Sequence, residues 1–139
     1  MRSRTIIDAG PLVALLDRKD RFHDWSRAQV ASVEPPLYSC EAALSEAAFL
    51  LRRLPGGSQA LLELVAKGLV EVSFSLQAET RPVQHLLMRY ANVPMSLADA
   101  CLVRLTEVYS DSVLLTLDSD FRIYRRHGRS VISVLLPDL

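Results

Sequence analysis

The chain has 139 residues, of which 50% are hydrophobic and 23% are charged, and its formal net charge at pH 7 is +0. This length and apolar content fit a single domain over residues 1–139 and exclude two domains of ordinary size. A neutral chain has no overall field that would draw it to nucleic acid or an anionic membrane, so any such binding needs a local patch of charge.

Short β-branched or apolar segments alternate along the chain with longer segments of helical periodicity. Strands are predicted at residues 5–8, 37–39, 69–73, 113–117 and 131–135. Helices are predicted at residues 11–16, 22–31, 41–53, 58–67, 79–90 and 97–109. This alternation predicts an α/β fold, in which a mostly parallel central sheet is flanked by helices.

Cysteine content and hydropathy indicate the compartment. Cys40 and Cys101 are the only cysteines, too few for a disulfide framework, and the helical spacing around Cys101 predicts a small buried side chain. No apolar stretch approaches the roughly 18 residues that a membrane-spanning helix needs. We therefore expect a cytoplasmic protein that does not bind a membrane.

Four carboxylates that are far apart in the chain stand where a purely structural role is hard to argue. Asp8 and Asp118 end two predicted strands, which is where ligands bind in open α/β sheets. Glu46 and Asp99 fall on apolar stripes of predicted helices and are expected to point inward, although Arg53 could neutralise Glu46. Four gathered carboxylates need a positive partner, and Mg²⁺ or Mn²⁺ prefers oxygen ligands. The pattern predicts a metal site.

Local structural interpretations exist for most of these acids. Asp8 can cap the helix that follows it, and Asp99 can form a capping box with Ser96. Asp118 and Asp120 can be ordinary turn residues, because aspartate bonds readily to its own backbone. For these residues both interpretations stay open.

Arginines crowd one short segment near the end of the chain. They are Arg122, Arg125, Arg126 and Arg129. One interpretation is a solvated face. The other is contact with phosphates, favoured by the position just after the last acids and by the match between guanidinium and phosphate geometry. Tyr124 and His127 in the same segment could also stack on bases.

Four segments, taken in order, resemble the motifs of the PIN-domain ribonucleases. They are residues 6–15 (IIDAGPLVAL), 45–46 (SE), 97–103 (LADACLV) and 115–121 (LTLDSDF). Within that family the chain is most similar to the VapC toxins of bacterial and archaeal toxin–antitoxin pairs. Each motif alone is weak, whereas four in the right order and spacing are specific, and the likeness extends over essentially the whole chain.

The resemblance implies a Rossmann-like, three-layer α/β/α sandwich that hydrolyses RNA phosphodiester bonds with Mg²⁺ or Mn²⁺. It implies that Asp8 and Asp99 are the main metal ligands, that Glu46 orients the metal or its water, and that Asp118 completes the cluster. Asp120 is the alternative fourth ligand, and Asp118 is preferred because it directly follows the predicted strand. The resemblance also implies a homodimer and a small DNA-binding antitoxin that blocks the nuclease.

Two positions depart from the family pattern. Ala9 stands where a small hydroxyl residue often follows the first aspartate, and Ser96 stands where many relatives carry another acid. Both changes remove polar groups near the predicted metal, so metal affinity could be weaker than in relatives.

We predict a metal-dependent endoribonuclease that is the toxin component of a VapBC-type toxin–antitoxin system. One alternative is an RNA-processing nuclease outside such systems, and another is a catalytically weak PIN-like binding module. A phosphatase built on Asp118-Ser119-Asp120 ranks lower, because Arg122 replaces the usual Thr or Val and little chain remains to complete that fold.

Overall fold

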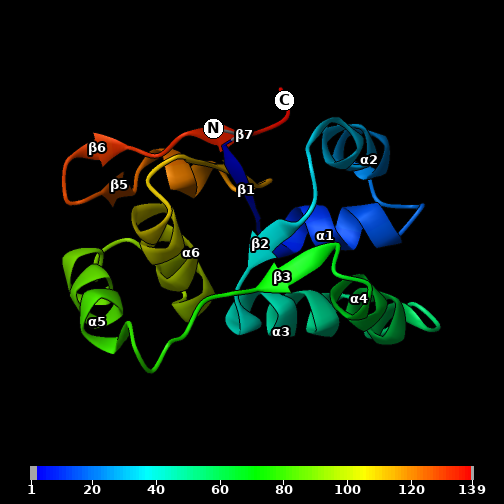
Figure 1. Cartoon of the computed structure of the whole chain (residues 1–139), viewed down its shortest axis with the longest axis horizontal. Coiled ribbons are helices and arrows are strands. Elements are labelled where there is room, and N and C mark those ends of the chain that lie inside the picture. Colours follow the sequence, from blue (N-terminus) through cyan, green and yellow to red (C-terminus); the bar gives the residue numbers. More distant parts are fainter. Residues whose placement is uncertain (1–2, 139) are drawn as a thin grey trace.

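A five-stranded sheet forms the middle of the molecule (Figure 1) in the computed structural model, which describes residues 3–138. Met1, Arg2 and Leu139, at the ends of the predicted domain range, lie outside the described residues. In spatial order the strands are β3 (Val70–Val72), β2 (Leu37–Ser39), β1 (Arg4–Ile7), β4 (Ser112–Leu115) and β7 (Val134–Leu135). Every neighbouring pair in this sheet is parallel, so the predicted parallel sheet is confirmed.

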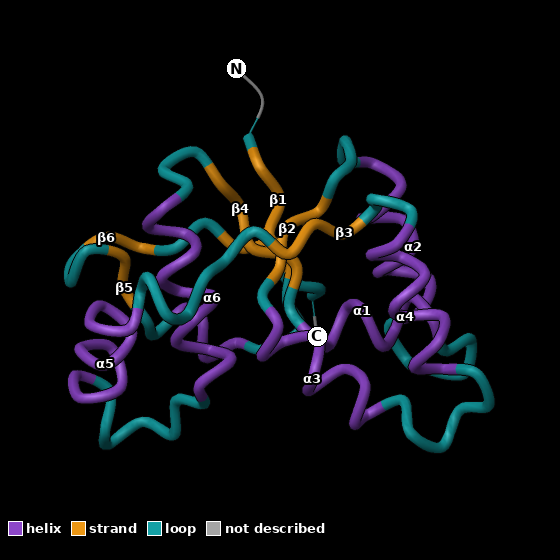
Figure 2. Tube along the Cα trace, turned by 60° about the horizontal axis from the view of Figure 1, so that its bottom comes forward, coloured by secondary structure: helices purple, strands orange, loops and turns teal. Residues whose placement is uncertain are grey.

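Helices cover both faces of the sheet, because parallel neighbours must be joined by crossovers. The helices are α1 (Ala9–Leu16), α2 (His23–Ser32), α3 (Glu41–Leu50), α4 (Gly57–Ala66), α5 (Thr80–Arg89) and α6 (Leu97–Val108). Figure 2 shows the strands between α5 and α6 on one side and α1, α2 and α4 on the other. Helix α3 contacts both α1 and α6, so it bridges the two helical layers. The predicted α/β/α sandwich is thus confirmed.

The two cores lie on opposite faces of the sheet, and consecutive strand residues alternate between them. Ile6 and Leu114 belong to the core beneath α5 and α6, whereas Ile7 and Leu115 belong to the core beneath α1 and α4. All four side chains are fully buried. Burial on both faces explains why consecutive residues at the ends of β1 and β4 are apolar instead of alternating with polar ones.

The prediction of one strand at residues 131–135 is wrong. Strand β6 (Ser130–Val131) instead pairs antiparallel with β5 (Arg125–Arg126) in a small hairpin, and only β7 joins the main sheet. Ile132 separates the two strands and is 2% exposed, because it turns into the core beneath α6. The hairpin turn has positive φ at His127 and Gly128.

Two other expectations concern helix length and the thiols. The helix predicted at residues 41–53 ends at Leu50 and continues as turns. Cys40 and Cys101 are both buried free thiols, as predicted. Within residues 3–138, every helix is too short or too polar to cross a membrane.

Candidate functional site

An open cavity of about 340 Å³ lies beyond the carboxyl ends of β1 and β4. It is lined by Asp8, Gly10, Glu46, Leu50, Asp99, Leu117, Asp118 and Ser119. Four of these side chains are carboxylates and none is basic. The structure therefore brings together the four acids that the sequence singled out, from the N-cap of α1, from α3, from α6 and from the loop after β4.

Asp8 is the most buried of the four acids and is held at both oxygens. It caps α1, since its Oδ1 accepts a hydrogen bond of 2.7 Å from the Ala9 amide. Its Oδ2 accepts a second bond, of 2.8 Å, from the Thr116 hydroxyl, 108 residues later in the chain. Burial raises the pKa of Asp8 to about 6, although these two hydrogen bonds lower it. The negative charges of Asp99 and Glu46 raise it further by a smaller amount. The capping interpretation is correct, and the same carboxylate also faces the cavity.

Asp99 is half-buried and sits in the first turn of α6. It forms the capping box with Ser96: the Asp99 amide donates to Ser96 Oγ (3.0 Å) and the Ser96 amide donates to Asp99 Oδ2 (3.3 Å). The Tyr124 hydroxyl donates to the same Oδ2 at 3.2 Å. Burial is the largest cause that raises the pKa of Asp99, and the nearby Asp118 adds to it.

Tyr124 is 0% exposed, so the interpretation that it stacks on bases is wrong. Its ring packs edge-on against Tyr90 and Phe121, with centroid distances of 5.1 and 5.3 Å. Burial and the negative charge of Asp99 raise the pKa of Tyr124. The phenol thus stays protonated and serves as a donor to Asp99.

Glu46 is exposed at the rim of the cavity, so the prediction that it points into the core is wrong. The buried face of α3 is made by Ala43, Leu44 and Ala47, and the stripe that contains Glu46 is largely open to solvent. Partial burial and the charges of Asp99 and Asp118 still raise the pKa of Glu46. Within residues 3–138 Glu46 forms no ion pair, with Arg53 or any other residue.

Asp118 does not directly follow a strand, because β4 ends at Leu115 and two residues intervene. It caps the short 3₁₀ helix η1 (Ser119–Arg122), and its Oδ1 accepts a hydrogen bond of 2.9 Å from the Asp120 amide. Asp118 lines the cavity, whereas Asp120 is not among the lining residues. The choice between them as metal ligand stays a prediction.

The donor set of the cavity fits a hard divalent cation. All charged lining groups are carboxylate oxygens, and burial and mutual repulsion raise the pKa of three of them. Among the described residues, however, no three acidic, histidine or cysteine side chains converge closely enough to enclose an ion. Mg²⁺ in particular is commonly held by one or two carboxylates and retains several waters. The cavity therefore fits a partly hydrated ion and does not form an all-protein cage.

Replacing Asp8 by Asn is expected to stabilise the metal-free protein at neutral pH. The folded-state pKa of Asp8, about 6, lies above its ordinary value of 3.8, so its contribution to stability is present below pH 4 and lost as the pH rises through 6. Asn does not titrate. The unfolding free energy of Asp8→Asn relative to wild type should rise by up to about 3 kcal/mol between pH 4 and pH 7. Urea unfolding in EDTA at several pH values measures this, and a pH-independent difference would contradict it.

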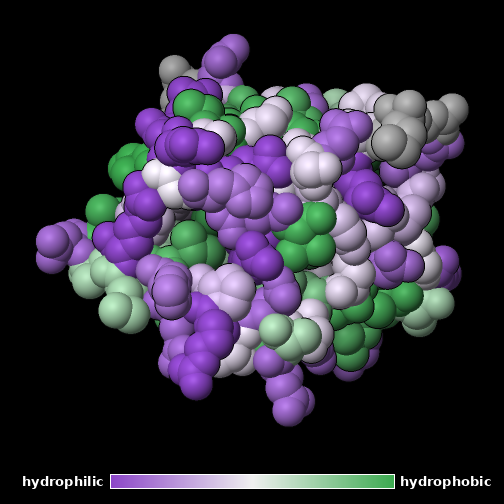
Figure 3. Space-filling model, turned by 60° about the vertical axis from the view of Figure 1, so that its left-hand side comes forward, coloured by the Kyte–Doolittle hydropathy of each residue, from purple (hydrophilic) through white to green (hydrophobic). Residues whose placement is uncertain are grey.

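The arginine segment divides into bound and free side chains. The Arg126 guanidinium donates to the Thr106, Tyr109 and Ser110 carbonyls at the end of α6, and Arg125 donates to three carbonyls of its own turn. These two arginines are structural, which corrects both interpretations for them. Arg122 and Arg129 are exposed. The face that carries α5 and the β5–β6 hairpin is largely hydrophilic, with scattered apolar patches (Figure 3).

A parallel sheet in the order β3-β2-β1-β4-β7, covered by helices and carrying acids at the carboxyl ends of its central strands, is the PIN-type α/β fold. The solved structures agree. The crystal structure of VapC20 from Mycobacterium tuberculosis, described as a toxin that cleaves the sarcin–ricin loop, matches with a TM-score of 0.74 and 20% sequence identity. The match covers 84% of this chain and 91% of that chain.

Two further comparisons define how far this likeness extends. No protein-family model matches the sequence, and no curated protein sequence matches it. At 20% identity, the likeness to VapC20 shows a shared fold. The resemblance read from the four sequence motifs is therefore confirmed at the level of the fold.

Thr116 and Tyr124 are the residues at the site that the sequence did not identify as partners of the acids. Thr116 supplies the hydroxyl group that Ala9 lacks next to Asp8. The position of Thr116, two residues before Asp118 and at the end of an apolar run, only weakly indicates that it lies at the site. Nothing local in the sequence links Tyr124 to Asp99, because their contact depends on how η1 packs against α6.

Proposed function

We propose that the chain is a Mg²⁺- or Mn²⁺-dependent endoribonuclease and the toxin component of a VapBC-type toxin–antitoxin pair. The observation that carries this is the acidic cavity, which four carboxylates from distant parts of the chain line without a basic residue. The shared fold with VapC20, a toxin described as cleaving the sarcin–ricin loop, supports the same activity.

In this proposal Asp8 and Asp99 are the main metal ligands, and Asp118 completes the set, with Asp120 as its alternative. When bound, the ion lowers the pKa of water and offsets charge that develops on the scissile phosphate. The hydroxyl groups of Thr116 and Tyr124 fix the orientation of two carboxylates, which lowers the cost of ordering them when the ion arrives.

Glu46 has a different role in the proposal, because it is the least restrained of the acids. Its side chain makes no hydrogen bond to another described residue and is exposed at the cavity rim. It is free to turn toward a water molecule in the cavity, orient it and accept its proton. The raised pKa of Glu46 improves it as a base.

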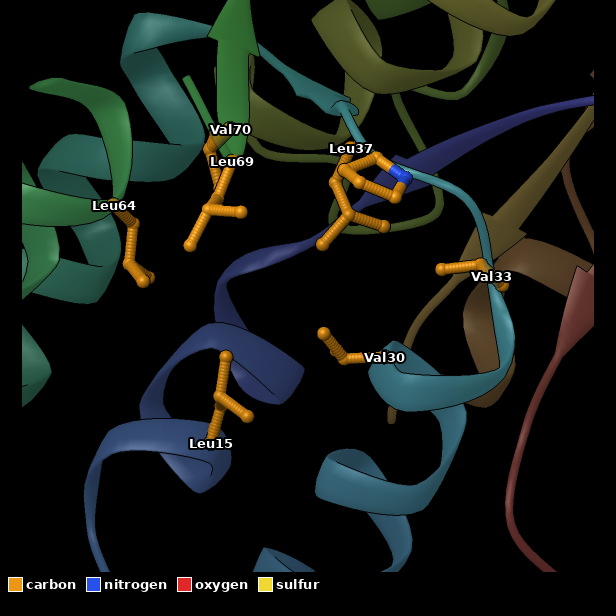
Figure 4. Close-up of a pocket in the computed structure, with 8 residues that line it drawn as sticks. Leu15, Val30, Val33, Leu37, Leu64, Leu69 and Val70 are labelled. Atoms are coloured by element: carbon orange, nitrogen blue, oxygen red, sulfur yellow. The ribbon is translucent and has the colours of Figure 1, made fainter. Parts of the chain in front are cut away.

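The proposal includes a homodimer, a cognate antitoxin and action in the cytoplasm. Large apolar side chains on three helices are exposed and offer area for such contacts: Phe49, Leu62 and Met88. An apolar pocket of about 130 Å³, lined in part by Leu15, Val30 and Leu64, opens between α1, α2 and α4 (Figure 4). An apolar side chain of a protein partner would fit such a pocket.

The first experiment is cleavage of a panel of structured RNAs by the purified, partner-free protein in Mg²⁺, Mn²⁺ or EDTA. Cutting that requires the metal supports the nuclease. A folded protein that binds neither ion and cuts no RNA would instead support the alternative of a PIN-like binding module. An RNA-processing role is distinguished by the gene neighbourhood, since a toxin is expected beside a short gene for a DNA-binding protein.

Tyr124→Phe is expected to weaken Mn²⁺ binding by about tenfold, since outer partners of metal ligands contribute on this scale. The substitution removes only the hydroxyl that donates to Asp99 Oδ2 and keeps the buried ring. Calorimetric titration with Mn²⁺ measures the affinity. Tyr109→Phe is the matched control, because it removes a hydroxyl that bonds Ser73 away from the cavity. Equal affinities for the two variants would show that Tyr124 does not position Asp99.

A further inference from the structure

A second cavity adjoins the acidic one. It has a volume of about 180 Å³ and shares Leu117 and Ser119 with the acidic cavity as lining residues. Its remaining lining residues are Arg122, Leu136, Pro137 and Asp138. The two cavities therefore form one continuous surface, which is acidic at one end and combines apolar side chains with one arginine and one aspartate at the other.

Arg122 is the basic residue of this surface. Arg122 is the last residue of η1, and Asp118 caps the start of the same short helix. Within residues 3–138 its side chain makes no hydrogen bond or ion pair, including with Asp138 across the cavity. In contrast, the guanidinium groups of Arg125 and Arg126 donate hydrogen bonds to backbone carbonyls. Arg122 is thus free to bind a ligand.

The chemistry of this surface defines its ligand. Guanidinium groups pair with phosphate oxygens, and the Ser119 hydroxyl can donate to the same group. Leu117, Leu136 and Pro137 provide an apolar wall against which a ribose or a base can lie. A phosphate beside four carboxylates is repelled unless a cation is near, and Arg122 is placed to supply that charge.

We propose that the cavity at Arg122 is a binding subsite for single-stranded RNA, which holds the phosphate and nucleoside adjacent to the bond that is cut. This inference rests on the proposed nuclease function and adds to it where the RNA strand lies beside the acidic cavity. Unpaired strands are favoured because only a nucleotide released from a helix can enter so small a cavity.

The test measures binding of a fluorescein-labelled, mixed-sequence single-stranded RNA to Asp99→Asn protein in Mg²⁺ over a series of salt concentrations. Adding Arg122→Gln should weaken binding about tenfold, the scale of one charge-assisted contact. It should also reduce the slope of log affinity against log salt by about 0.7, the value for one phosphate on a single strand. Arg122→Lys should keep the slope and lose part of the affinity, because the charge stays and the planar fork is lost.

Arg129→Gln is the matched control, since it removes another exposed arginine, in the β5–β6 hairpin and outside both cavities. Equal slopes for Arg122→Gln and Arg129→Gln would overturn the subsite. If wild type still cuts RNA in a metal-dependent way, that result leaves the nuclease intact. If the Asp99→Asn protein binds no RNA and the wild type cuts none, both the subsite and the nuclease function are wrong.

Discussion

Asp99→Asn is expected to reduce metal-dependent RNA cleavage by more than about 100-fold, because even outer partners of metal ligands contribute 10- to 100-fold. The substitution removes a negative donor from the acidic cavity and keeps the shape of the side chain. The amide oxygen can still accept from the Ser96 amide, so the capping box at the start of α6 should persist. Initial rates of RNA cleavage in Mg²⁺, with the unfolding free energy measured in parallel, test both parts.

Asp20→Asn is the matched control for this prediction. Asp20 also accepts a hydrogen bond from a backbone amide, that of Phe22 at 2.9 Å, but it lies outside the acidic cavity. Its substitution should leave cleavage unchanged. Equal rates for wild type and Asp99→Asn would mean that the cavity does not carry out the reaction.

Phe121→Ala is expected to lower the unfolding free energy by about 3–5 kcal/mol, the usual cost of truncating a buried phenylalanine. Phe121 is 0% exposed and packs edge-on against Tyr124, so it anchors η1 to the core beneath α6. Since the total free energy of unfolding of a small domain is only about 5–15 kcal/mol, the variant should be close to unfolding at 37 °C. Urea unfolding followed by circular dichroism measures the change.

Ile123→Ala removes a large apolar side chain only two residues away and is the comparison for this prediction. Ile123 is 51% exposed, so the effect should stay within about 0.5 kcal/mol. A similar loss in both variants would show that backbone propensity in η1, and not the packing of Phe121, sets the stability of this segment.

Much of the fold could be predicted because its signals are local. Strands β1 and β4 end in apolar residues, and each helix carries a cap or breaker near its ends. The region after residue 120 could not be predicted in the same way. Strands β5, β6 and β7 have two residues each, too few for any periodicity, and their partners are decided by the burial of Ile132.

Strand ends, helical periodicity and the family resemblance predict the acids of the site, but they do not predict which residues contact these acids. The apolar stripe of α3 that contains Glu46 predicts a buried face, and that prediction is wrong because the stripe is largely exposed. Phe49 and Leu50 in that stripe are 61% and 49% exposed, since α3 bridges two layers instead of lying flat on the sheet. The bonds from Thr116 and Tyr124 span 108 and 25 residues, so only the folded chain creates them.

That separation along the chain has a consequence during synthesis. Asp8 emerges from the ribosome early, but its Thr116 partner and Asp118 are added only after about four-fifths of the 139 residues. Strand β4, which precedes them, must also insert beside β1 before these groups reach the cavity. A partly translated or prematurely terminated chain thus lacks a complete acidic cavity.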